Sequence, residues 1–118
     1  MNFLDSMKEL ADTATKNVTS LSKSTALKIE TKMKIRDLKN EIDDLNIVIR
    51  KSNEKIGSMF VDEFKNKISM DEEQVKNLIY KIDDSISRIA DINIKIKDIE
   101  KDFQEKLDEI EREKCEER

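Results

Sequence analysis

Hydrophobic residues recur at alternating steps of three and four through the middle of the chain, a pattern that predicts the apolar seam of a coiled coil. The seam continues over eight positions, and Ser52 is its one polar member. Its hydrophobic members are Ile35, Leu38, Ile42, Leu45, Ile49, Ile56 and Met59. We therefore predict a coiled-coil helix over residues 31–66.

The same spacing returns in the second half of the chain. Its first members are Val75, Ile79, Ile82, Ile86 and Ile89. A strict continuation runs through Asn93, Ile96, Glu100 and Phe103, whereas a shifted one runs through Ile92, Ile96, Ile99 and Phe103. Both continuations resume at Leu107 and Ile110. The strict one places Asn in the seam, where a lone Asn fixes register, and the shifted one buries no polar group, so both stay open.

Residues 92–97 also alternate between Ile and a polar residue, which is the pattern of a strand. Because helical spacing flanks this short segment on both sides, we predict that it is helical. In a helix its Ile residues spread around much of the circumference, as Ile47 also does. This extra apolar width indicates that each helix contacts more than one neighbour.

We place a turn at residues 67–70 and a second coiled-coil helix with an acidic tail over residues 71–118. Ser69 and Glu72 have the Ser-x-x-Glu spacing of a capping box, and the acidic residues that follow favour a helix N-terminus. The predicted fold class is all-α. Its architecture is a long antiparallel helical hairpin, a coiled coil with an N-terminal amphipathic arm, that assembles into a bundle.

The arm, residues 1–30, either stands alone or continues into the next helix. Its apolar face, a candidate surface for a partner or for lipid, contains Phe3, Leu4, Met7, Leu10, Ala11, Ala14 and Val18. The first arm of the hairpin is about 16 residues longer than the second, so this face has no partner within the hairpin. Burying it requires a fold-back, a second protomer or an anionic membrane surface. We expect at least a dimer, a homo-oligomer.

Composition excludes several function classes. The chain has one Gly and no Pro, His or Trp, and 42% of its residues are charged. Glycine-rich phosphate loops and His-dependent catalysis or zinc binding are therefore excluded. Adjacent carboxylates such as Asp43 and Asp44 diverge by about 100° on a helix. A net charge of −4 with interspersed bases and few aromatic residues disfavours nucleic acid binding. We expect no catalytic, cofactor-binding or metal-binding residues and no cofactor.

Acidic residues repeat every four positions near the C-terminus. They are Glu105, Glu109, Glu113 and Glu117. A hairpin that folds about residue 68 brings them opposite Lys32, Lys28, Lys23 and Lys16. Exposed ion pairs contribute about 0.2–1 kcal/mol each, so we expect them to select the antiparallel orientation rather than to supply stability.

Targeting and redox signals are few. Cys115 is the single cysteine, so an intramolecular disulfide is impossible, as suits a reducing compartment. Apolar runs reach three residues, compared with the ~20 that a spanning helix needs. We expect a cytoplasmic protein, with a peripheral position at the membrane as the alternative.

The order of several short patterns resembles a known family. These patterns are the start Met-Asn-Phe-Leu-Asp-Ser-Met, the Lys/Ser/Thr/Ala-rich arm, the segment Lys55-Ile56-Gly57-Ser58-Met59-Phe60 and the final Glu113-Lys114-Cys115. The chain resembles small cytoplasmic proteins of low-GC Gram-positive bacteria that join a helical hairpin to a C-terminal zinc ribbon. That ribbon begins at Cys-x-x-Cys-Gly, whereas Cys115 is followed by Glu116, Glu117 and Arg118. The resemblance therefore implies the helical hairpin without the ribbon, and it implies no activity.

From the pattern we predict a non-enzymatic, self-associating coiled-coil scaffold or adaptor protein. One alternative is a peripheral membrane protein that uses its N-terminal amphipathic helix. A further alternative is a partner for the secretion of helical-hairpin proteins. That one rests on Tyr80 and Asp84, which match a Tyr-x-x-x-Asp/Glu signal.

Overall fold

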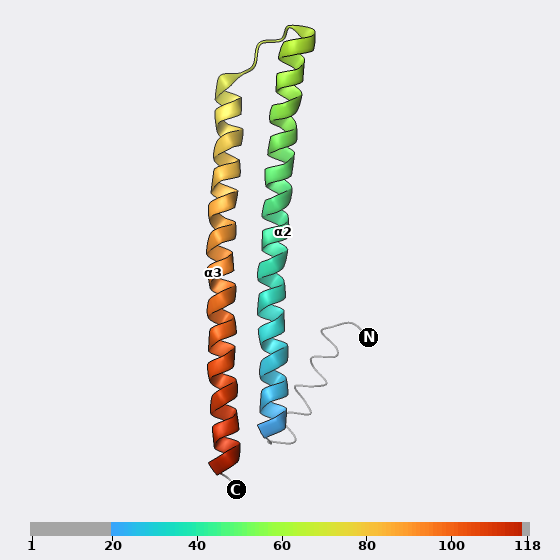
Figure 1. Cartoon of the computed structure of the whole chain (residues 1–118). Helices are drawn as coiled ribbons and strands as arrows, with labels where there is room; N and C mark the ends of the chain where they lie inside the picture. The colour runs from blue at the N-terminus through green and yellow to red at the C-terminus, as the bar shows by residue number, and fades with distance from the viewer. Residues whose placement is uncertain (1–19, 117–118) are drawn as a thin grey trace, which may run out of the picture. The chain divides into compact units, whose positions relative to one another are not determined.

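The chain forms two α-helices joined by a short turn (Figure 1), in a computed structural model that describes residues 20–116. Helix α2 is Ser20–Asn66 and helix α3 is Glu72–Glu116. The prediction of an all-α helical hairpin is confirmed. The predicted apolar face of the arm, from Phe3 to Val18, lies outside the described residues.

The hairpin divides into two compact units, and both helices pass through each of them. One unit is Leu38–Ile94, in which the two helices run antiparallel on either side of the turn. In the other unit, residues 20–37 of α2 lie beside residues 95–116 of α3, again antiparallel. Long helices are expected here because the sequence contains no Pro and a single Gly to interrupt them.

Helix α2 ends where Lys67 adopts a left-handed backbone conformation, with φ of 58°. The N–H of Ile68 then donates a 3.3 Å hydrogen bond to the carbonyl oxygen of Asp62. This bond turns the chain back over the last turn of α2, which ends the helix.

Helix α3 begins with Asp71 as its N-cap. The Asp71 Oδ1 atom accepts hydrogen bonds from the backbone N–H groups of Glu73, at 3.1 Å, and Gln74, at 3.2 Å. The Asp71 carbonyl oxygen accepts the first helical bond, from the N–H of Val75, at 3.0 Å. The predicted capping box at Ser69 is therefore wrong. Asp71 stands directly before the first turn, within reach of its free N–H groups, and Ser69 lies two residues too early.

The seam predicted on α2 coincides with the least exposed face of that helix. Ser52 is buried, at 5% exposure, and the seven hydrophobic positions from Ile35 to Met59 are half-buried. In coiled-coil notation, with seven positions named a to g, these residues occupy positions a and d.

The seam of α3 differs from the prediction at two places. Leu78 is half-buried and Ser85 is buried, at 3% exposure, whereas Ile79 and Ile86 are 47% and 53% exposed. Positions a and d therefore pass through Leu78 and Ser85, and Ile79 and Ile86 occupy the neighbouring position e. In the single copy these two Ile residues therefore lie outside the seam between α2 and α3, so their assignment to a hairpin seam is wrong, and their predicted place in a seam between copies stays a prediction. Leu78, three residues after Val75, and Ile79, four residues after it, both fit the spacing of a helix. Leu78 is the one that lies a whole number of heptads before Ser85, Ile92 and Ile99.

Farther along α3 the shifted continuation is the one that the structure adopts. Ile92 and Ile96 are buried, at 6% and 7% exposure, while Asn93 and Glu100 are exposed. Half-buried residues extend this face at Ile99, Phe103, Leu107 and Ile110. Ile94 is 58% exposed, so the strand-like alternation resolves into the spacing of a helix, as predicted.

The two buried serines lie at nearly equal numbers of residues from the turn, Ser52 on α2 and Ser85 on α3. Both belong to the Leu38–Ile94 unit. A small side chain in the seam is covered completely when two helices pack together, so both serines are less exposed than the half-buried hydrophobic seam residues around them.

Replacing Gly57 with alanine should increase the free energy of unfolding by about 1 kcal/mol. Gly57 lies inside α2 without a positive φ, and a Cβ atom added there would meet nothing within 4 Å. The glycine therefore lowers the stability of the helix through its poor helix propensity. No neighbouring atom requires a residue without a side chain at this position. Urea unfolding followed by circular dichroism at a fixed protein concentration measures the difference. A less stable variant would contradict this interpretation of Gly57.

Candidate interaction surface

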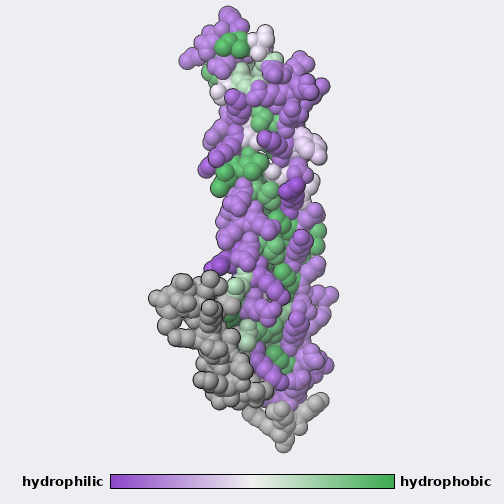
Figure 2. Space-filling model, turned by 180° about the vertical axis from the view of Figure 1, so that it is seen from behind, coloured by the Kyte–Doolittle hydropathy of each residue, from purple (hydrophilic) through white to green (hydrophobic). Residues whose placement is uncertain are grey.

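Exposed large hydrophobic side chains are concentrated in one of the two units. In the described part of the chain they all lie between residues 47 and 94, inside the Leu38–Ile94 unit. They are Ile47, Val48, Phe60, Val61, Phe64, Ile68, Ile79, Tyr80, Ile86 and Ile94. Figure 2 shows hydrophobic residues as separate green patches among hydrophilic ones on the face in view. Exposed apolar surface of this kind marks candidate interaction sites.

Two of these residues form an aromatic pair near the end of α2. The rings of Phe60 and Phe64 stack with their centroids 5.8 Å apart. They are four residues apart and therefore neighbours on one helix face. Phe64 nevertheless stays 76% exposed and Phe60 55%. Stacking on each other covers only part of two large apolar rings, so this face retains apolar surface for a further contact.

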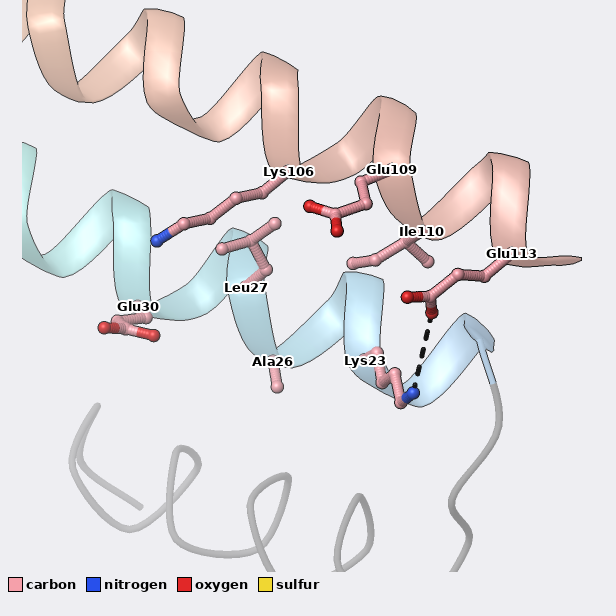
Figure 3. Close-up of a pocket in the computed structure, with 8 residues that line it drawn as sticks. All are labelled: Lys23, Ala26, Leu27, Glu30, Lys106, Glu109, Ile110 and Glu113. Carbon is pink, nitrogen blue, oxygen red and sulfur yellow. Dashed lines mark ion pairs between the residues drawn. The ribbon is translucent and has the colours of Figure 1, made fainter.

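An open groove of about 520 Å³ lies in the other unit, between the N-terminal part of α2 and the C-terminal part of α3. Its lining residues are Lys23, Ala26, Leu27, Glu30, Lys106, Glu109, Ile110 and Glu113. Leu27 and Ile110 lie between the two helices, with charged residues around them (Figure 3). The groove thus combines a narrow apolar floor with a rim of both charge signs.

An ion pair closes one end of this groove. Lys23 Nζ lies 3.8 Å from Glu113 Oε2, and both side chains are about half exposed. This contact joins α2 to α3 and confirms the predicted pairing of the acidic tail with the lysines of the first helix, for this pair. Other ion pairs, such as Lys34 with Glu30, connect residues one turn apart on one helix.

A double-mutant cycle on Lys23 and Glu113 should give a coupling energy between about 0.2 and 1 kcal/mol, because solvent screens a half-exposed pair. The alanine variants of each residue and their combination are compared by urea unfolding, with and without 1 M NaCl. Added salt should reduce the coupling. Glu111→Ala combined with Lys23→Ala is the matched control, with a coupling near zero. A coupling that persists undiminished in 1 M salt would contradict a screened surface pair.

The described residues carry little conventional site chemistry. Between residues 20 and 116, no three or more His, Cys, Asp or Glu residues are grouped so as to hold a metal ion. None of the helices described has an apolar stretch long enough to cross a membrane. Cys115 is exposed and is not in a disulfide. Tyr80 and Asp84, which match the Tyr-x-x-x-Asp/Glu signal, both lie on α3. Tyr80 is 72% exposed, and Asp84 forms an ion pair with Arg88, with 3.1 Å between Asp84 Oδ2 and Arg88 Nε.

Comparison with protein-family models, with curated proteins and with solved structures returns no match for this chain. The resemblance to hairpin proteins with a zinc ribbon therefore stays a prediction. The surface of the hairpin itself is therefore the basis for a proposed function.

Proposed function

We propose that this chain is a non-enzymatic coiled-coil scaffold or adaptor that self-associates, so that its function is the helical surface it presents. The observation that carries the proposal is the small amount of core in a single copy. Among the described residues, Ile92 and Ile96 are the buried hydrophobic side chains, and the other hydrophobic seam positions stay half-buried.

Two helices alone cannot surround their seam, and burial of apolar surface is the dominant favourable contribution to folding. A second pair of helices, as in a four-helix bundle, covers the sides that the first pair leaves open. Self-association therefore accounts for the half-buried seam and for part of the exposed hydrophobic surface of the Leu38–Ile94 unit.

The experiment is a thermal unfolding series over a hundredfold range of protein concentration. If folding is coupled to assembly, the midpoint rises with concentration, because mass action favours the assembled native state. A midpoint that does not change across the series, with a single cooperative transition, would contradict the proposal.

A further inference from the structure

The two sides of the seam in the Leu38–Ile94 unit differ in charge. In an antiparallel pair of helices, the two e positions lie on one side of the seam and the two g positions on the other. On the g side, five of seven positions in this unit are charged. The g positions are Glu41, Val48, Lys55 and Asp62 on α2, and Gln74, Lys81 and Arg88 on α3.

On the e side the middle six positions carry no charge. They are Asn46, Asn53, Phe60, Ile79, Ile86 and Asn93, and we call them the e strip. All six are exposed in the single copy. Positions e and g of a coiled coil that faces water are commonly Glu or Lys. A run of uncharged e positions beside a charged g side indicates that the e side is shielded from water in the working state.

We propose that the e strip is the interface with a second copy of this chain; this inference rests on the proposed function. The hydrophobic centre of the interface is Phe60 and Ile79, with Ile86 on α3 and the stacked ring of Phe64 beside them. Phe60 and Ile79 lie at nearly the same distance from the turn, on opposite helices, so their side chains contribute to one continuous surface.

The area of this surface matches what a dimer needs. A standard interface buries about 800 Å² on each partner, of which a little over half is apolar. Phe60, Phe64, Ile79 and Ile86 are between 47% and 76% exposed. With side chains of this size, they offer on the order of 400 Å² of apolar surface. The half-buried seam residues next to them supply the remainder.

The test compares two double variants of the full-length chain by sedimentation equilibrium. Phe60→Glu with Ile79→Glu places two charges in the e strip, and the dissociation constant should rise at least about 100-fold. The matched control, Val48→Glu with Ile94→Glu, places the same charges at exposed positions outside the strip, and it should change the constant less than about threefold. Far-UV circular dichroism checks that helicity is retained.

The possible results separate two questions: whether the chain self-associates, and whether the e strip is the surface through which it does so. If the wild type and the Phe60/Ile79 variant both assemble, the e strip is not the interface, although the proposed function stands. If the wild type stays monomeric, both proposals fail, and flotation with phosphatidylcholine–phosphatidylserine vesicles would then assign the strip to lipid. If the Glu variant loses helicity, Phe60→Ala with Ile79→Ala replaces it. That variant should weaken assembly at least tenfold, and unchanged assembly would overturn the interface.

Discussion

Replacing Ile92 with alanine is expected to lower the free energy of unfolding by about 2–5 kcal/mol. Ile92 is 6% exposed and lies in the Leu38–Ile94 unit, so the truncation both removes buried methyl groups and leaves a cavity. In a hairpin with so few buried hydrophobic residues among those described, a loss of this size is a large share of the total stability.

The matched control is Ile94→Ala, the same substitution two residues farther along α3. Ile94 is 58% exposed, so the expected loss is below about 1 kcal/mol. Urea unfolding at one fixed protein concentration measures both variants. Equal losses for the two variants would contradict the helical burial pattern of residues 92–96, in which alternate Ile residues have opposite environments.

Replacing Ile42 with aspartate is expected to destabilise the hairpin by more than about 3 kcal/mol and to abolish assembly. Ile42 occupies a half-buried a position of the α2 seam. The variant no longer buries the apolar surface of the isoleucine side chain. It also places an aspartate carboxylate in a seam of hydrophobic residues, where burying a charge is unfavourable.

Ile47→Asp serves as the comparison, since Ile47 is 40% exposed and lies outside the seam on the same helix. Its expected loss is at most about 1 kcal/mol, with assembly retained. Circular dichroism and sedimentation report stability and mass for both variants. A variant of Ile42 that remains folded and assembled would show that the seam lies on another face of α2.

The fold class was predictable because helical spacing flanks the one strand-like segment, residues 92–97, on both sides. The 3-4 spacing of α2 also coincides with the least exposed face of that helix, since a single set of hydrophobic residues fits the heptad there. The α3 seam was harder to predict. Val75 is followed by hydrophobic residues at steps of both three and four, and the true seam passes through the polar Ser85.

A signal for the correct register was nevertheless present downstream. Ile92, Ile96, Ile99 and Phe103 define a heptad phase, and extending that phase backwards places Ser85 and Leu78 in the seam. Choosing the most hydrophobic residue at each step gave Ile86 instead. The burial of Ser85 depends on how closely α2 packs against α3 at this level, which local spacing does not encode.

Function is predicted less directly than fold. An interaction surface needs no particular catalytic side chains, so its signature is a departure from the usual composition of solvated positions. Here the departure is the uncharged e strip, which became visible only after the register of α3 was known. The sequence pattern assigns Ile79 and Ile86 to the seam, where they would be buried. From that assignment there is no reason to expect an exposed apolar surface on the e side of the hairpin.

The measurement that tests self-association most directly is the solution mass of the full-length chain by size-exclusion chromatography with light scattering. The account predicts a mass at least twice that of one 13.8 kDa chain, maintained on dilution into the micromolar range. A mass of a single chain at every concentration would contradict it, because the half-buried seam and the e strip would then remain exposed to water.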